Sequence, residues 1–212
     1  VTLSTANASL NTLKLVGSAG GTNVTLNGTN ALTSGGVIFD NTLGSASISG
    51  GQLGATGAEV IIFTGGTGSN STNKLTLTAV IKGTATVLTK SGSGTLVLAG
   101  ANTYTGSLII NAGTVEFSNG AASQNLGNPT AAATNIILNG GVLRPTATTS
   151  LIYGITVNGP AAIDIGTGVT LTQTAQGITG ASALASATAS STGLSAGLLQ
   201  KTGLGTLTLA GT

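Results

Sequence analysis

Histidine, cysteine, methionine and tryptophan are all absent from this sequence of 212 residues. Without histidine or cysteine, the chain has no Ser-His-Asp or Cys-His nucleophile, no thiolate or imidazole metal ligand and no disulfide. Charged residues make up only 5% of the chain, whereas a typical soluble domain carries about 25%. We therefore expect a protein with no enzyme activity, no cofactor and no metal site.

The few charges are also badly placed for two common classes of partner. The six cations are dispersed along the chain and have no interleaved aromatic residues, so nucleic-acid binding is not expected. The stretch from Ile165 to Gln200 carries no charge, but it consists mostly of Ala, Ser, Thr and Gly. Because it lacks the run of about 20 strongly apolar residues that a spanning helix needs, we expect no membrane insertion by this segment.

The absence of methionine has a consequence for the extent of the chain. A primary translation product begins with methionine, so Val1 is expected to lie downstream of an initiator. We interpret residues 1–212 as a single segment of a longer chain or assembly.

Short alternating strands joined by corners of small residues recur along the sequence. One polar residue precedes each corner, and these residues lie 22, 62, 28 and 19 positions apart: Asn27, Ser49, Asn111, Asn139 and Asn158. The longest gap has room for about three further units, so the period is irregular but close to 20 residues.

Such a pattern also suits a run of antiparallel hairpins. A closed sandwich, however, would have few large side chains to fill the space between its sheets, because aromatic residues make up only 2% of the chain. A solenoid needs only a thin stack of aliphatic residues, each buried against its equivalent in the next coil. We predict an all-β parallel β-helix of about nine or ten coils of 20 to 22 residues, with residues 181–191 as a loop or an irregular coil.

A longer internal match marks two places in the chain. KSGSGTLVLAG from Lys90 and KTGLGTLTLAG from Lys201 are identical at eight of eleven positions. The first copy continues through Asn102-Thr103-Tyr104 and Asn111-Ala112-Gly113. It resembles the passenger-associated transport repeat of bacterial autotransporters, over residues 90–127, with a second partial copy at 201–212. The resemblance implies a right-handed parallel β-helix that is exported through the cell envelope.

The residues that carry the motif are expected to shape corners and strands. Gly92 and Gly94 would supply positive φ at a corner, and Thr95 to Leu98 would form a strand. We expect Tyr104 to cap the coil with its hydroxyl in solvent, and Glu116 to be an outward strand residue. The motif positions are Lys90, Gly92, Gly94, Thr95, Leu96, Leu98, Asn102, Thr103, Tyr104, Gly106, Asn111 and Gly113.

Two functions remain open from the sequence. The first is a structural or adhesive β-helix, a stalk or scaffold that is extracellular or on a bacterial cell surface, with a glycan or protein of a host or cell surface as partner. The alternative is a carbohydrate-active β-helix, because Asp40 and Glu59 are separated by nearly one repeat period and would fall on adjacent coils.

The two ends suggest a further partner. Ala210-Gly211-Thr212 followed by Val1-Thr2-Leu3-Ser4 resembles the internal stretch from Ala112 to Ser118. End-to-end stacking of copies, in tandem or as a filament, would explain this match. A segment cut at arbitrary points from one long chain would explain it equally well, since short matches arise easily in sequence of low complexity.

Overall fold

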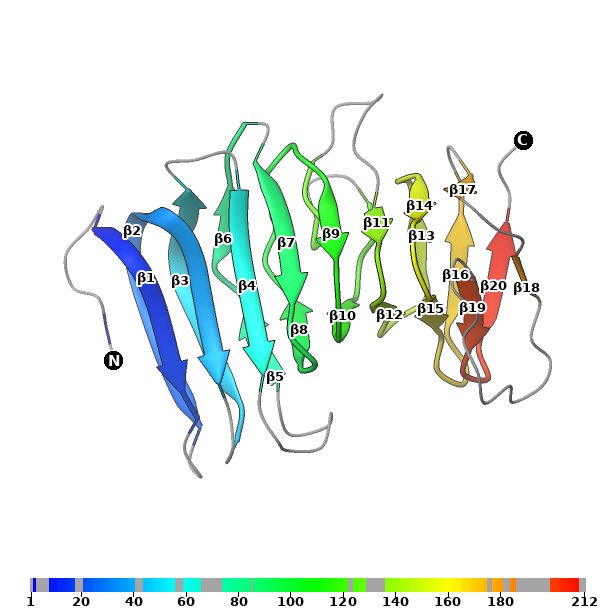
Figure 1. Ribbon diagram of the computed structural model, residues 1–212, viewed down its shortest axis with the longest axis horizontal. Helices are drawn as coiled ribbons and strands as arrows, with labels where there is room; N and C mark the ends of the chain where they lie inside the picture. Colours follow the sequence, from blue (N-terminus) through cyan, green and yellow to red (C-terminus); the bar gives the residue numbers. More distant parts are fainter. Residues whose placement is uncertain are drawn as a thin grey trace.

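The structure is a computed structural model and consists of strands stacked along one axis (Figure 1). It describes residues 2, 8–17, 21–40, 44–55, 59–65, 74–84, 86–121, 124–128, 136–174, 177–180, 184–185 and 199–209.

Twenty strands and no helix occur in those residues, so an all-β chain is confirmed. The strands are β1 (Ser9–Val16), β2 (Thr22–Asp40), β3 (Ala46–Ala55), β4 (Glu59–Gly65), β5 (Lys74–Leu77), β6 (Val80–Lys82), β7 (Val87–Ser91), β8 (Thr95–Leu98), β9 (Leu108–Ile110), β10 (Thr114–Phe117), β11 (Ile136–Leu138), β12 (Val142–Pro145), β13 (Thr149–Leu151), β14 (Ile155–Val157), β15 (Ala161–Asp164), β16 (Thr170–Gln173), β17 (Ile178–Gly180), β18 (Leu184–Ala185), β19 (Leu199–Thr202) and β20 (Thr206–Leu209).

Every strand-to-strand pairing is parallel, and the pairings form three ladders that follow the chain from coil to coil. The first ladder joins β2, β3, β5, β8, β10, β12, β15 and β19. The second joins β1, β2, β3 and β6 and, further along, β13, β16 and β20. The third joins β1, β2, β4, β7, β9, β11, β14 and β17, and it faces the viewer in Figure 1. This arrangement is the predicted parallel β-solenoid.

The coils are less regular than predicted. Along the third ladder, successive partners are Thr12, Gly36, Ile61, Thr89, Ile109, Ile137, Thr156 and Thr179. The steps between these partners are unequal, because the corners differ in length while the strands keep their register. The expectation of nine or ten coils of 20 to 22 residues was therefore wrong, since this ladder contains eight strands in the described residues.

The core is a set of aliphatic columns, one residue wide on each ladder. Alternate residues of a strand point inward, and parallel register places each one on its equivalent in the next coil. One column of the first ladder is fully buried from coil to coil: Leu75, Leu96, Val115, Leu143 and Ile163. These columns supply the thin core that the sequence led us to expect.

Two further expectations concern the stretch from 181 to 191 and membrane-spanning helices. The stretch from 181 to 191 lies outside the described residues except for β18, which is a short strand and not part of a loop. No helix in the described part of the chain has the length and apolar character needed to cross a membrane.

The column arrangement gives a direct test. Leu96→Ala removes a fully buried side chain from the column and should destabilise the chain by about 2–5 kcal/mol. Val97→Ala changes the neighbouring, half-buried residue on the opposite face of β8 and should cost less than about 1 kcal/mol. Urea unfolding of both variants measures the difference, and equal losses would contradict the inward orientation of Leu96.

Candidate functional site

The motif residues occupy one corner-strand-corner unit of the solenoid. Lys90 lies in β7, the corner glycines Gly92 and Gly94 follow it, and β8 contains Thr95, Leu96 and Leu98. The segment from Asn102 to Gly106 leads to β9, and Asn111 and Gly113 form the corner before β10. The structure thus brings both glycine corners of the motif together on successive coils.

Lys90 occupies an inward position of an aliphatic column. Its partners in the third ladder are Ile62 on one side and Ile110 on the other, and its side chain is fully buried. The ammonium donates hydrogen bonds to the carbonyl oxygens of Ser91 at 2.8 Å, Gly92 at 2.7 Å and Ala112 at 3.1 Å. Two of these carbonyls belong to its own corner and one to the corner of the next coil, so the lysine fastens two coils together. Sequence reasoning had found the motif but had given this lysine no role.

Glycine is required where the two corners touch. Gly92 has φ of 77° and Gly113 has φ of 70°, both in the left-handed region that favours glycine. A Cβ atom on Gly113 would lie 2.8 Å from Nζ of Lys90 and closer still to the carbonyl oxygens of Gly92 and Gly94. Gly94 itself has no positive φ, so that expectation was wrong. The amide of Gly94 instead donates a hydrogen bond to the carbonyl oxygen of Thr64 at 2.9 Å, and its carbonyl oxygen accepts one from the amide of Thr114 at 3.2 Å.

The second copy of the motif builds the same corner in a different ladder. Lys201 pairs with Ile163 in the inward column of the first ladder, and its ammonium donates a hydrogen bond to the carbonyl oxygen of Gly203 at 2.5 Å. Gly203 has φ of 72°, close to that of Gly92. The next strand, β20, joins the second ladder, whereas β8 joins the first. The motif therefore encodes a type of corner and not a fixed position in the coil.

Buried amides close the segment that follows β8. Asn102 is fully buried; its Oδ1 accepts from the amide of Ile81 at 2.8 Å, and its Nδ2 donates to the carbonyl of Asn125 at 2.6 Å. Asn125 in turn donates to the carbonyl of Gly100 at 3.2 Å. These side chains link three successive coils where regular strand pairing is interrupted. Thr103 continues the link, because its amide donates to Ile81.

The prediction for Tyr104 was wrong. The residue is 1% exposed, and its hydroxyl has no hydrogen-bond partner among the described residues. Burial raises its pKa, and so does the neighbouring Tyr153. Burial also raises the pKa of Tyr153 to about 12, but the Tyr153 hydroxyl donates to the carbonyls of Gly127 and Ala121. Tyr104 is a core residue and not a solvent-exposed cap.

Three of the five polar corner residues form a ladder on the surface. Asn139 donates to Asn111 at 2.6 Å, and Asn158 donates to Asn139 at 3.1 Å, so these amides stack across three coils. The other two residues do not align in this way. Ser49 pairs in register with Thr25 and not with Asn27, and Asn27 lies in the stretch between Leu26 and Thr29 where the register of β2 and β3 shifts. Asn27 and Ser49 are therefore not equivalent positions.

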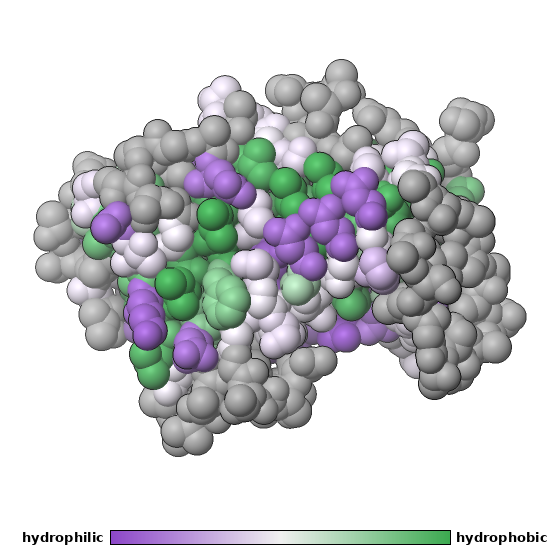
Figure 2. Space-filling model, viewed as in Figure 1, coloured by the Kyte–Doolittle hydropathy of each residue, from purple (hydrophilic) through white to green (hydrophobic). Residues whose placement is uncertain are grey.

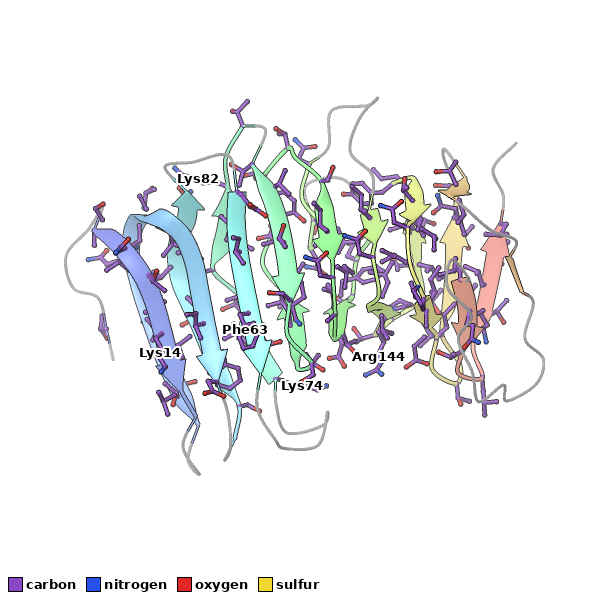
Figure 3. All side chains as sticks on the ribbon, viewed as in Figure 1. Lys14, Phe63, Lys74, Lys82 and Arg144 are labelled. Atoms are coloured by element: carbon purple, nitrogen blue, oxygen red, sulfur yellow. The ribbon has the colours of Figure 1, made fainter. Side chains whose placement is uncertain are left out.

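A group of charged side chains, which we call the ionic clasp, crosses the outer surface of the first ladder. It consists of Lys74, Glu116, Arg144 and Asp164, four of the ten charged residues (Figure 3 labels both cations). Lys74 contacts both carboxylate oxygens of Glu116 at 2.9 and 3.0 Å. Arg144 contacts Glu116 at 3.1 Å through Nη1 and Asp164 at 2.8 Å through Nε.

The clasp corrects the interpretation of Glu116. Its neighbours Val115 and Phe117 are in the core, so Glu116 does point away from the core, but it is only 5% exposed. Lys74 belongs to β5 and Glu116 to β10, and β8 lies between these strands. The lysine side chain therefore crosses a whole strand to reach the carboxylate, and the clasp joins β5, β10, β12 and β15.

The carboxylates considered for carbohydrate chemistry are not brought together. Asp40 pairs with Gly65, which lies six positions after Glu59 on β4. Six positions along a strand correspond to about 20 Å, whereas the two carboxyl groups of a glycosidase lie about 5 to 9.5 Å apart. No cluster of three or more acidic, histidine or cysteine residues suited to a metal ion occurs in the described residues.

Comparison with known proteins agrees with this geometry. Residues 88–117 match the family model of the passenger-associated-transport-repeat. Over 144 residues the chain is 35% identical to the "Adhesin BmaC autotransporter" of Brucella suis biovar 1 (strain 1330), a match that covers 62% of this chain. The chain spans about 4% of the length of that relative. No solved structure matches the chain.

The parallel pairings and the lysine corner define the class of this protein as a parallel β-solenoid. The chain carries a passenger-associated transport repeat at residues 88–117 and is similar over 144 residues to an autotransporter adhesin.

The buried lysine and tyrosines predict an unusual pH dependence of stability. Burial lowers the pKa of Lys90 from 10.5 to about 7, so between these values the unfolded chain binds a proton that the folded chain does not, and stability should rise with pH. Above pH 10 the unfolded tyrosines lose protons that the folded chain retains, so stability should fall. The urea midpoint should therefore be highest near pH 10. In Lys90→Met the urea midpoint should no longer rise between pH 7 and 10, whereas in the control Lys82→Met it should still rise. A urea midpoint of the unmodified chain that does not change with pH would contradict the prediction.

The ionic clasp predicts a second loss of stability. Glu116→Gln removes the charge shared by Lys74 and Arg144 and should destabilise the chain by about 2 kcal/mol, as expected for hydrogen bonds to charged groups. High salt should reduce the difference, because both cations are one-third exposed. The control is Asp40→Asn, on an exposed carboxylate outside the clasp. Urea unfolding at low and high salt measures both, and an equal effect of the two variants would contradict a role for the clasp.

Proposed function

We propose that the chain is a non-enzymatic, structural part of an adhesive surface protein, a stalk or scaffold that is extracellular or on the bacterial cell surface. The observation that carries this proposal is the use of the motif residues. Lys90, Asn102 and Gly113 face neighbouring coils, and their polar groups hold those coils together. Polar groups that are engaged in this way support the extension of a rod and do not line a substrate pocket.

The adhesive part of the proposal is supported by the relative, which is named an adhesin. A solenoid offers such a protein a long surface on which side chains repeat at the strand spacing of about 4.8 Å. The partner we propose is a glycan or protein of a host or cell surface. The carbohydrate-active alternative loses support, because Asp40 and Glu59 lie far apart along the strands.

We also propose that the coil at residues 199–209 accepts a further coil. Leu204 is 86% exposed and Leu209 is 50% exposed. Lys90 reaches a carbonyl of the following coil at Ala112, whereas Lys201 reaches only its own corner at Gly203. A following coil, from a continuing chain or from a second copy, would cover the leucines and supply the missing carbonyl. The tail-to-head match itself involves residues 1, 3, 4 and 210–212, which lie outside the described residues.

Adhesion and hydrolysis can be tested in parallel. Beads coated with the chain should be retained on cultured epithelial cells several-fold better than beads coated with Leu96→Asp, which places a charge in the core and should prevent folding. Neither the chain nor an Asp40→Asn, Glu59→Gln variant should release reducing ends from a panel of polysaccharides. Retention no better than the control would contradict the adhesive role, and hydrolysis that is lost in the double variant would contradict the structural one.

A further inference from the structure

An apolar surface lies on the outer side of the third ladder, over β2 and β4. We call it the β2–β4 patch: Ile38, Ile61 and Phe63, which are 36%, 39% and 41% exposed. Val16, 63% exposed, extends it onto β1. Figure 2 shows this hydrophobic area on the left half of the visible face. The other four aromatic residues, Phe39, Tyr104, Phe117 and Tyr153, are at most 3% exposed, so Phe63 alone presents a ring to the outside.

The Phe63 ring is seated on glycines. A Cβ atom on Gly65 would lie 2.5 Å from Cε1 of the ring, and one on Gly92 would lie 3.0 Å from Cε2. The Phe63 ring therefore lies over Gly65 of its own strand and beside Gly92 of the next coil, two positions that have no side chain. This seat holds the ring near the sheet and leaves its other side exposed.

A notch lies beside the patch at Gly36. Gly36 and Ile61 are partners in the pairing of β2 with β4, as are Ile38 and Phe63. The nearest atoms to a Cβ built on Gly36 belong to Thr12, at 3.6 Å, which is an ordinary contact. In one pair of the patch a glycine without a side chain, Gly36, lies beside Ile61. In the pair two residues further along the strands, Ile38 lies beside Phe63.

From this register we infer that the β2–β4 patch is the interface of a symmetric dimer of this chain. A two-fold axis in the plane of the interface, parallel to the strands and midway between β2 and β4, exchanges the two strands. Ile61 of each copy then faces the notch at Gly36 of the other, and Ile38 of each copy faces the ring of Phe63 of the other. Two sheets packed face to face lie about 10 Å apart, a distance that such side chains fill.

The charges around the patch agree with this axis. Asp40 pairs with Gly65, so the two-fold places the carboxylate of one copy opposite a glycine of the other and not opposite a second carboxylate. Lys14, on β1 outside the exchanged strands, comes to face Ser91 on β7. Among the side chains that the structure describes, no like charges meet, and the apolar residues are self-complementary, as an isologous interface requires.

A second copy fits the patch better than a sugar does. A hexose on the Phe63 ring would need several hydrogen-bonding groups around it. The residues next to the ring on its own strand and on β2 are Ile61, Gly65 and Ile38, and none of these side chains can form a hydrogen bond. Ser91 on β7 is the single polar side chain in direct register with Phe63.

Sedimentation equilibrium of the purified chain over a wide concentration range tests the proposal. The chain and a Leu209→Ser control, which alters an exposed leucine far from the patch, should both dimerise. Phe63→Ser and Gly36→Ile should each raise the dimer dissociation constant about tenfold or more. Because φ of Gly36 is ordinary and a Cβ atom fits there, Gly36→Ile should fold; circular dichroism and the urea midpoint verify this, and Phe63→Ser provides an independent test.

A swapped pair gives the sharpest result. In the Gly36→Ile, Ile61→Gly variant, the two-fold again places an isoleucine opposite a glycine, so dimerisation should recover relative to Gly36→Ile alone. No such recovery is expected if another molecule covers the patch. The proposal would be overturned if the chain were a monomer at all concentrations, or if Phe63→Ser left the dimer unchanged. Association that is lost only in Leu209→Ser would also overturn it and would indicate end-to-end contact instead.

Discussion

The structure depends on the parallel register between successive coils. Each coil has only one inward residue per ladder level, so it can bury that residue only against its equivalents in the coils before and after. The column from Leu75 to Ile163 shows the result, with every member fully buried. A change of register at one corner would move the inward residues of the following strand off their column.

The lysine of the repeat meets this constraint in an unexpected way. A buried amino group is costly unless it is hydrogen-bonded, and Nζ of Lys90 lies within hydrogen-bond distance of three carbonyls of two stacked corners. Those carbonyls converge because Gly92 and Gly113 have positive φ and let the two corners approach. Lysine and glycines thus form one unit, which explains why the motif can recur at Lys201 in another ladder with the same hydrogen bond to its own corner glycine.

Sequence periodicity predicted the parallel stacking of the strands, but it did not predict contacts between residues of distant coils. Alternation and asparagine corners were sufficient for the parallel β-helix, and Asn111, Asn139 and Asn158 do stack. Glu116 was placed on the correct side of its strand, but its burial comes from Lys74, 42 residues earlier, which no local pattern contains. Asp40 and Glu59 failed for a related reason: a separation of nearly one repeat period suggests adjacent coils, but it does not give the offset along the strands.

The central claim is that Lys90 fastens two coils through their corner carbonyls, and hydrogen exchange at the corner amides tests it most directly. The amides of Gly94, Asn111 and Thr114 donate to carbonyls of the preceding coil. In the unmodified chain these corner amides should exchange as slowly as the amides of the buried strands. In Lys90→Met they should exchange much faster, while amides of β12 and β15 remain protected. Unchanged protection of these three amides in the variant would contradict the account.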